Sequence, residues 1–292
     1  MGGGTRQMKI MLLGATGYLG GNIARFLSEE GNEVICVVRR TSDISRLKGL
    51  ENIRLISKDP GQIELTLGQD CVDWVINGVC TYMPNASLYG DMLESNVIFP
   101  LSVLNLAIKY QVKNFITMGT GLPENFNVYS FTKSKFSDFG RFLSEKDGIN
   151  FGDFRLEMFY GGLYEPEARF LNSCRKKLAE NQSILLTYGR QKRDIIHVED
   201  ILGIISALIH SEYLRGYRVL PVGSGEQHSI REITTYMKRV MGSSSLLQFG
   251  AVPERGGEPD TLADISWYKE IDYQMKYSFF EGLEKVCTKL NN

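Results

Sequence analysis

The chain has almost no excess of charge and no long apolar run, and these two absences exclude several kinds of partner. It contains 33 lysine and arginine residues against 34 aspartate and glutamate residues, a formal net charge of −1. Nucleic acids and anionic membrane surfaces attract basic proteins, so neither is expected as the main partner. By this reading no apolar stretch is long enough to cross a bilayer and no secretory signal is visible, so we expect a cytoplasmic protein.

Cysteines are few, and their spacing excludes the common metal and disulfide frameworks. The five cysteines, at positions 36, 71, 80, 174 and 287, form no C-x-x-C pair and are odd in number. Buried, reduced thiols are therefore expected, and no metal site is expected. The leader over 1–7 is glycine-rich and polar, and we expect it to be a flexible end outside the fold.

The segment from Met8 to Arg40 has the pattern strand, glycine turn, helix, strand. Glycines spaced G-x-x-G-x-x-G follow a short apolar run and precede helical periodicity. This arrangement lets backbone N–H groups and a helix N-terminus approach a pyrophosphate without a Cβ clash. The sequence therefore predicts a dinucleotide site rather than an ordinary glycine-rich turn. The cofactor-binding residues expected in this turn are Gly14, Thr16, Gly17, Tyr18, Leu19 and Gly20.

The residues after the second strand, expected over 33–38, indicate which nicotinamide cofactor is used. An NAD site usually has an acid there to accept the ribose hydroxyls. This chain has Arg39 and Arg40 instead. A guanidinium pairs well with the 2′-phosphate of NADP, so we predict NADP(H) as the cofactor. Two solvated surface arginines are the alternative interpretation.

Strands and helices alternate through the first half of the chain. The expected strands cover 53–57, 72–78, 114–120 and 150–160, and the expected helices cover 41–50, 94–110, 129–144 and 198–209. This alternation predicts an α/β fold with a doubly wound parallel (Rossmann) sheet over 8–160. The pattern loosens from Gly161 onward. We therefore expect 161–292 to be mainly a smaller C-terminal substrate-binding lobe, with 195–222 returning to the first domain.

Polar or small residues follow two of the expected strands. Asp59 lies just past 53–57, and Asn77 and Gly78 end the strand over 72–78. Ligands bind at the carboxyl ends of strands in an open parallel sheet, so these residues are candidate cofactor contacts. The alternative is turn chemistry, because Asp-Pro and Asn-Gly favour turns in any case.

Three residues form a candidate catalytic group. Tyr129 and Lys133 lie four residues apart on the helix expected over 129–144, so their side chains share a face. A lysine ammonium beside a phenol favours the phenolate, which makes Tyr129 a usable general acid and base. Thr120 ends the preceding strand, where its hydroxyl can bond a substrate carbonyl.

With these motifs the chain resembles the extended short-chain dehydrogenases/reductases, in the branch that acts on nucleotide sugars. The strings that carry the resemblance are GATGYLG at 14–20, QKRDIIHVED at 191–200, ERGGEPD at 254–260 and ADISWYKEIDYQMKYSFFEGL at 263–283. The resemblance implies that Thr120, Tyr129 and Lys133 are the catalytic triad. It also implies that Tyr129 exchanges the proton on the sugar oxygen and that Lys133 holds the nicotinamide ribose.

The resemblance also implies contacts with a nucleotide-sugar substrate. Arg193 and Arg255 fall where the family grips the substrate's phosphates, and Asn96 falls on an asparagine that supports the active-site helix. Met158 stands where the family has an asparagine, so one substrate contact is lost or taken over by a neighbour. The segment over 121–128 is shorter than usual, which implies a more open site around Thr120.

The reaction is narrowed by the residues after Thr120. The 4,6-dehydratases of the family have Asp-Glu there, whereas this chain has Gly121-Leu122, so dehydration is not expected. A double epimerase of the family needs an extra acid/base pair close to this position. The only candidates for that pair are Cys174 and His197, and both are remote from it in the sequence. Arg39 and Arg40 indicate NADPH, which suits a net reduction with exchange of the cofactor. The sequence therefore predicts a reductase that acts on the 4-keto group of a sugar nucleotide.

The similarity of two short sequence segments narrows the predicted substrate. The strings LEMFYGGLYEPEARF and LTYGRQKRDIIHVED are most similar to the CDP-sugar 4-ketoreductases, which make CDP-abequose or CDP-paratose for bacterial O-antigen lipopolysaccharide. A nucleotide-sugar 4-epimerase and a non-catalytic NADP-binding regulator stay as alternatives. The nucleotide base, the deoxygenation pattern of the sugar and the stereochemistry of reduction stay open. Family members commonly dimerise through the helices expected over 94–110 and 129–144, so we also expect a homodimer.

Overall fold

A computed structural model gives the structure of the chain and describes residues 6–82, 89–254 and 256–288. The described residues form two compact units. The first, the sheet unit, contains the residues up to 120 together with 127–155 and 204–220. The second unit contains 121–126, 156–203 and the residues from 221 onward. Arg255 and the first five residues of the leader lie outside the described residues.

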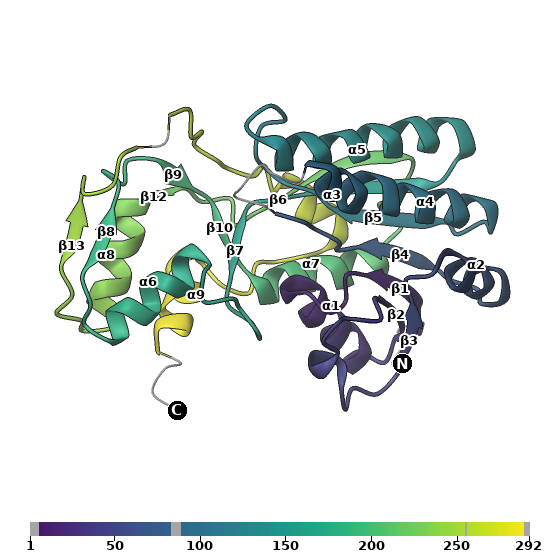
Figure 1. The fold of residues 1–292 in the computed structure, drawn as a ribbon, viewed down its shortest axis with the longest axis horizontal. Coiled ribbons are helices and arrows are strands. Elements are labelled where there is room, and N and C mark those ends of the chain that lie inside the picture. The colour runs from purple at the N-terminus through teal and green to yellow at the C-terminus, as the bar shows by residue number, and fades with distance from the viewer. Residues whose placement is uncertain (1–5, 83–88, 255, 289–292) are drawn as a thin grey trace. The chain divides into compact units, whose positions relative to one another are not determined.

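A seven-stranded parallel sheet is the centre of the fold (Figure 1). In spatial order its strands are β3 (Ile53–Ser57), β2 (Glu33–Val38), β1 (Lys9–Leu13), β4 (Trp74–Asn77), β5 (Asn114–Met118), β6 (Asn150–Leu156) and β11 (Tyr217–Val222). The chain begins in the middle of the sheet, builds one edge, and then crosses over to build the other. This order is that of a doubly wound Rossmann fold, as the sequence predicted, with a seventh strand that it did not predict.

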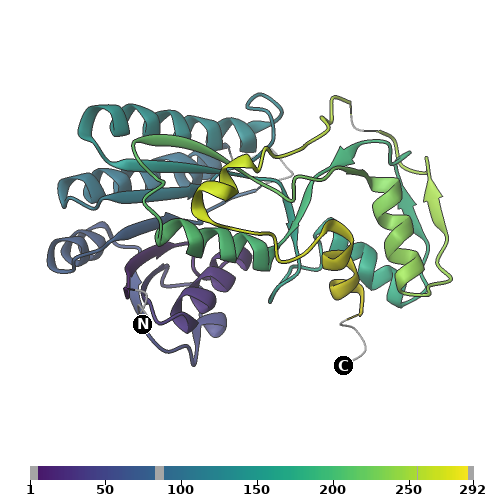
Figure 2. The same cartoon turned by 180° about the vertical axis from the view of Figure 1, so that it is seen from behind.

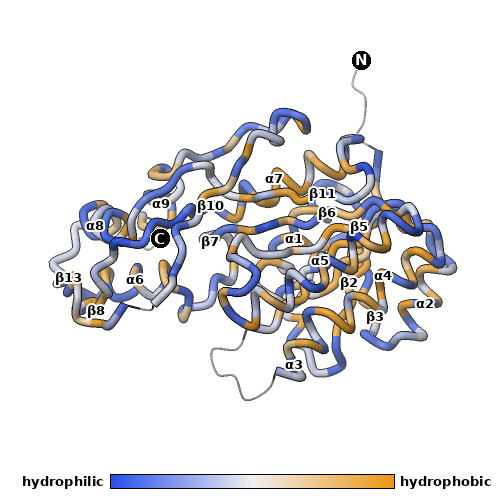
Figure 3. Tube along the Cα trace, turned by 90° about the horizontal axis from the view of Figure 1, so that it is seen from above, coloured by the Kyte–Doolittle hydropathy of each residue, from blue (hydrophilic) through white to orange (hydrophobic). Residues whose placement is uncertain are grey.

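Helices cover both faces of the sheet (Figures 1 and 2). One face packs against α2 (Pro60–Gln69), α4 (Phe99–Lys109) and α5 (Val128–Asp147), and the other against α1 (Tyr18–Glu29) and the later part of α7 (Val198–Ile209). Successive strand residues point to opposite faces of the sheet. Met11 and Leu13 of β1 therefore pack on the face covered by α2, α4 and α5, while Ile10 and Leu12 are buried on the face covered by α1 and α7. Both faces of the inner strands β1, β2 and β4 are buried, which explains why these strands are almost continuous apolar runs (Figure 3).

The helical run before β5 differs from the sequence prediction in two ways. It begins earlier, with α3 (Tyr89–Leu93), and passes through a π-helical turn, η3 (Glu94–Ile98), before α4. This run has 21 residues, and an 18-residue window within it has a mean hydropathy of 1.2. By length and composition alone it is apolar enough to cross a membrane, so the expectation that no such stretch exists was wrong. Val103 and Leu104 of α4 are nevertheless fully buried against the sheet, which is the behaviour of a core helix.

Two other segments also differ from the prediction. The helix expected over 41–50 is only a short 3₁₀ turn, η1 (Ser45–Leu47), because Asp43 and Ser42 side chains bond nearby backbone N–H groups and hold a loop. The strand expected over 150–160 is two strands, because the chain leaves the central sheet at Glu157 and continues as β7 (Met158–Tyr160). β7 pairs with another strand, β10 (Ile195–His197).

The second unit has short strands and three helices around its own core. Its further elements are α6 (Phe170–Ala179), β8 (Ile184–Leu186), β9 (Lys192–Arg193), β12 (His228–Ser229), α8 (Ile230–Val240), β13 (Leu247–Phe249), η4 (Ser266–Ile271) and α9 (Phe279–Thr288). β8 pairs with β13 and β9 pairs with β12. The core is formed by apolar side chains such as Leu178, Ile233 and Leu283 from the three helices. The unit therefore has the contacts of an independent hydrophobic core.

Candidate functional site

The glycine turn between β1 and α1 is built by backbone segments that touch one another. Gly14 has φ +82°, a conformation that glycine adopts without strain. A Cβ on Gly14 would lie 2.8 Å from the Gly78 carbonyl carbon, and a Cβ on Gly20 would lie 2.1 Å from the Gly14 carbonyl oxygen. The turn therefore depends on glycine at both positions, and it brings the end of β4 against the start of α1.

This turn presents the amino end of α1 without a side-chain cap. Gly17 is the N-cap residue, and it makes no side-chain cap hydrogen bond to this helix. Tyr18 and Leu19 bury their side chains, so they can contact a ligand mainly through the backbone, whereas Thr16 is partly exposed. The positive end of a helix dipole next to a glycine cradle fits the pyrophosphate of a dinucleotide. The residues present thus fit a nicotinamide cofactor.

Basic side chains lie close to this turn in the chain. Arg39 and Arg40 follow β2 and are exposed, and within the described ranges neither guanidinium takes part in an ion pair. The sequence analysis missed Arg46 of η1, whose guanidinium donates a hydrogen bond of 3.2 Å to the Thr16 carbonyl. The spacing R-R-x-x-x-x-x-R was the signal for it. Arg46 therefore adds a half-buried positive charge directly at the glycine turn.

The polar residues after β3 and β4 have structural partners. The Asp59 carboxylate accepts a hydrogen bond of 3.2 Å from the Gln62 N–H and caps α2. The buried Asn77 amide donates to the Thr117 hydroxyl (3.0 Å) and accepts from the Val79 N–H (3.1 Å). These bonds account for both residue types at these positions. Cofactor contacts from Asp59, Asn77 or Gly78 remain predictions.

Lys133 is held between two strand ends. Its ammonium is buried and donates hydrogen bonds to the Val79 carbonyl (2.9 Å), just past β4, and to the Met118 carbonyl (2.8 Å), at the end of β5. Burial lowers the pKa of Lys133, while the charge of Asp153 opposes that shift. A lysine ammonium has three N–H donors, and among the described residues two of them have partners, which leaves one for a ligand.

Tyr129 lies one turn before Lys133 in the first turn of α5. The helix begins with a reciprocal pair of hydrogen bonds between Asn127 and Ser130, which fixes the start of this turn. The ring of Tyr129 is half-buried and contacts Tyr82 edge-to-face, with centroids 5.3 Å apart. Thr120 follows β5 by two residues and is also half-buried. The sheet unit thus contains all three predicted catalytic residues.

Asn96 joins the segment after β4 to α5. Its buried side chain accepts from the Thr81 N–H (2.9 Å) and donates to the Thr81 carbonyl (3.2 Å) and the Thr132 hydroxyl (3.1 Å). The π-helical turn η3 positions this side chain by changing the register of the helix. Asn96 therefore supports the helix that contains Tyr129 and Lys133.

The sequence analysis also missed Asp153, a buried carboxyl in the middle of β6. It accepts a hydrogen bond of 2.7 Å from the Ser137 hydroxyl, and the Ser137 hydroxyl also bonds the Tyr217 hydroxyl. Burial raises the pKa of Asp153, while the Ser137 hydrogen bond and the charges of Arg155 and Lys133 lower it. An acid within an otherwise apolar strand was the available signal. The Asp153 carboxyl and the Lys133 ammonium therefore interact electrostatically inside the sheet unit.

Two further predicted substrate contacts, Met158 and Arg193, lie in the second unit, whereas Asn96 and Thr120 lie in the sheet unit. The Arg193 guanidinium is buried, pairs with Glu258 at 3.0 Å, and donates to the Lys192 and Pro259 carbonyls. Met158, half-buried in β7, pairs with Ile195 of β10. A phosphate at Arg193 therefore competes with, or joins, an existing ion pair.

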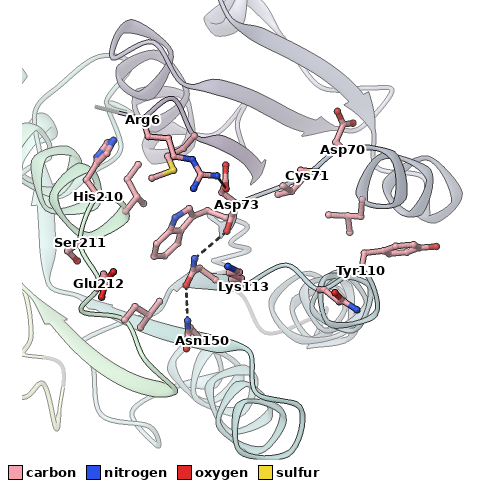
Figure 4. A pocket seen from close by; sticks show the side chains of 18 of the residues that line it. Arg6, Asp70, Cys71, Asp73, Tyr110, Lys113, Asn150, His210, Ser211 and Glu212 are labelled. Carbon is pink, nitrogen blue, oxygen red and sulfur yellow. Dashed lines mark hydrogen bonds and ion pairs between the residues drawn. The ribbon is translucent and has the colours of Figure 1, made fainter. Parts of the chain in front are cut away.

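A separate recess of about 810 Å³ opens at the other edge of the central sheet (Figure 4). Its walls include residues at the amino ends of strands: Asp73 before β4, Lys113 before β5 and Asn150 at the start of β6. Arg6 forms an ion pair with Asp73 across it, at 2.8 Å. Ligands of open parallel sheets bind at the carboxyl ends, so this recess is not the candidate site.

Comparison with known proteins agrees with this geometry. The sequence pattern described as "NAD dependent epimerase/dehydratase family" matches residues 10–223. The chain belongs to this family. The resemblance to extended short-chain dehydrogenases/reductases is thereby confirmed, and the membership accounts for the glycine turn, since the family is named for its nicotinamide cofactor.

Individual relatives of this family member differ in their reactions. A CDP-abequose synthase from Salmonella typhimurium is 27% identical, covering 96% of this chain and 98% of the relative. A UDP-glucose 4-epimerase from Lactobacillus helveticus is 24% identical, and the match covers 87% of this chain and 88% of the relative. The solved UDP-glucose 4-epimerase of Thermotoga maritima, in complex with UDP-glucose, has a TM-score of 0.84 at 20% identity, covering 97% and 98%. The last comparison shows the shared fold alone.

The glycine turn generates a stability prediction. Gly20→Ala adds a methyl group against the Gly14 carbonyl, and overpacking of this kind should lower the free energy of unfolding by about 1–3 kcal/mol. Gly21→Ala is the matched control, because its Cβ would meet only ordinary contacts of 3.5 Å in the same helix. Urea unfolding of both variants measures the difference. Equal stability of the two variants would contradict the close approach.

Proposed function

We propose that the protein is an NADPH-dependent reductase of the 4-keto group of a nucleotide-linked deoxyhexose, with CDP-4-keto-3,6-dideoxyglucose as the candidate substrate and CDP-abequose or CDP-paratose as the product. The observation that supports it most is the fixed Lys133 ammonium one helical turn from Tyr129, in a chain with a glycine cradle for the cofactor. The similarity to a CDP-abequose synthase supports the choice of sugar.

The proposed roles follow from the chemistry of each side chain. The bound nicotinamide cofactor supplies the hydride. Tyr129 donates its phenolic proton to the 4-oxygen, which would otherwise develop an uncompensated negative charge. Lys133 stabilises the phenolate that remains and uses its third N–H on the cofactor ribose, while Thr120 donates a hydrogen bond to the same oxygen. Arg193, with Arg255, is the proposed phosphate end of the substrate site, where a phosphate competes with the Glu258 carboxylate for the Arg193 guanidinium.

NADPH is proposed because three arginines are near the glycine turn in sequence or in space and no acid ends β2. Arg39 and Arg40 are exposed, and Arg46 already contacts the turn.

A nucleotide-sugar 4-epimerase is the second candidate, supported by the similarity to UDP-glucose 4-epimerases. The two are separated by incubating the protein with NADPH and 4-keto-6-deoxy sugar nucleotides and following nicotinamide absorbance. A reductase consumes NADPH stoichiometrically, an epimerase interconverts sugars without net consumption, and a non-catalytic regulator does neither.

The first functional prediction concerns the cofactor. Replacing Arg39 and Arg40 together by Ala should weaken NADPH binding by about 2–3 kcal/mol, because charge-assisted bonds to the 2′-phosphate are lost. NADH binding should change little. Arg215→Ala is the control, since this arginine is exposed and paired with Glu212 beside the recess at the other edge of the sheet. Equal losses for NADPH and NADH in fluorescence titrations would rule out the assignment.

The second prediction concerns proton transfer. Tyr129→Phe keeps the ring and removes the proton donor, so kcat should fall by about 10²–10⁴-fold while NADPH still binds. Lys133→Met should lose activity and also weaken NADPH. Thr120→Val should have a milder effect, because one hydrogen bond is lost. A Tyr129→Phe enzyme that reduced its substrate at near the wild-type rate would show the catalytic assignment to be wrong.

The third prediction concerns assembly. Three phenylalanines of α5, Phe131, Phe139 and Phe142, are 44%, 44% and 59% exposed. A patch of this kind is typical of an interface, so we propose a homodimer in which α5 contacts its copy. Light scattering should give twice the chain mass, and Phe139→Asp with Phe142→Asp should give the single mass. Leu185→Asp, an exposed apolar residue of β8, is the control that should leave the mass unchanged.

A further inference from the structure

A glutamate of the second unit lies where a side chain of residue 121 would lie. Glu157 is half-buried between β6 and β7, and its N–H donates to the Val222 carbonyl at 2.9 Å. The Gly121 N–H donates to the Leu156 carbonyl at 2.8 Å, which fixes Gly121 beside it. A Cβ on Gly121 would lie only 2.2 Å from the Glu157 Oε1. The carboxyl group therefore covers the backbone of Gly121, and only glycine leaves room for it.

A buried hydroxyl lies beside this carboxyl. Thr261 is 6% exposed, and its Oγ1 has no hydrogen bond of regular geometry among the residues that the structure describes. Its backbone is held in place, since its N–H donates to the Lys192 carbonyl and its carbonyl accepts from the Asp194 N–H. The hydroxyl acts as a donor toward the Glu157 carboxyl, whose pKa it lowers, so the two groups face one another and a ligand hydroxyl between them would give both a regular hydrogen bond.

The charge state of Glu157 is not fixed by an ion pair. Burial raises the pKa of this carboxyl to about 7, the adjacent Thr261 hydroxyl and the Arg193 charge lower it, and the Asp194 charge raises it. Near neutral pH the group is therefore present both as an acid and as a carboxylate. Both forms accept a hydrogen bond, and the acid also donates one.

Gly121 directly follows Thr120, the residue proposed to meet the substrate carbonyl. Consecutive Cα atoms are about 3.8 Å apart, so a sugar whose 4-carbonyl bonds Thr120 has other substituents of its ring within reach of position 121. In a nucleotide-linked 4-keto-3,6-dideoxyhexose the hydroxyl among these substituents is the one on C2. We propose that Glu157 and Thr261 form a subsite for a sugar hydroxyl, which donates to the Glu157 carboxyl and accepts from the Thr261 hydroxyl. This inference rests on the proposed function, because it takes the ligand to be a nucleotide-linked sugar.

The test compares binding of a sugar nucleotide with binding of its nucleotide alone, so it does not depend on turnover. CDP-, UDP- and dTDP-4-keto-6-deoxyglucose are titrated by calorimetry against the wild type with NADP⁺ present, together with CDP, UDP and dTDP. With the sugar nucleotide that binds best, Glu157→Ala and Thr261→Val should each weaken binding about tenfold, the loss of one hydrogen bond. Binding of the matching nucleoside diphosphate should not change, and Glu157→Gln should restore part of the loss.

Glu165→Gln is the matched control. Glu165 is a half-buried glutamate of the same unit with a pKa raised by burial, but its carboxyl accepts from the Gly161 N–H at 3.0 Å. This variant should bind the sugar nucleotide as the wild type does. Equal weakening of sugar nucleotide and nucleoside diphosphate by Glu157→Ala or Thr261→Val, or no weakening by either, overturns the subsite. A wild type that binds no sugar nucleotide more tightly than its nucleoside diphosphate overturns it too.

The same data separate this inference from the proposed reaction. A wild type that shows the sugar-dependent binding but oxidises NADPH neither with the three sugars nor with CDP-4-keto-3,6-dideoxyglucose, the candidate substrate, refutes the reductase and supports the subsite. Thermal unfolding of each variant gives the folded fraction. Glu157→Gln and Thr261→Val keep nearly the native side-chain volume. If Glu157→Ala does not fold, the sugar-nucleotide affinities of these two variants test the subsite.

Discussion

A buried ammonium is stable only if hydrogen bonds replace its water, and Lys133 meets this condition by bonding two strand-end carbonyls. Because Val79 follows β4 and Met118 ends β5, these bonds attach α5 to the carboxyl edge of the sheet. Tyr129 is one turn away on the same helix, and Asn96 holds that helix a second time through Thr132. The position of the proposed proton donor therefore depends on one cation and one amide, both buried.

At the glycine turn, close backbone contacts fix the structure as the Lys133 hydrogen bonds do at the start of α5. The Gly14 and Gly20 positions exclude a Cβ because strand, helix and the segment after β4 meet there. This cradle explains why the family binds a dinucleotide, but it does not select a reaction, since family relatives include both a CDP-abequose synthase and 4-epimerases. The choice between them depends on side chains around the sugar and on the 2′-phosphate end of the cofactor.

Glu157 shows how the arrangement of such side chains can differ from their order in the chain. Gly121-Leu122 lacks the acids that dehydratases have after the Ser/Thr, and for this reason dehydration was not expected. The structure brings a carboxyl over Gly121 from the end of β6 instead. Absence of an acid from one segment therefore did not mean absence of an acid from that part of space.

The sequence by itself determined the parallel sheet, the glycine turn and the helix over 129–144, because each has a local signal: buried apolar runs, glycine spacing, and a capped amphipathic helix ended by Gly148. It missed α2, although Asp59 and Pro60 are a typical helix start. Only the tertiary structure decided that Asp153 lies near Lys133, that Arg46 contacts Thr16, and that Thr261 lies beside Glu157. These contacts join residues far apart in the chain or across a loop, and burial, which shifts their pKa values and removes their water, exists only once the chain has folded.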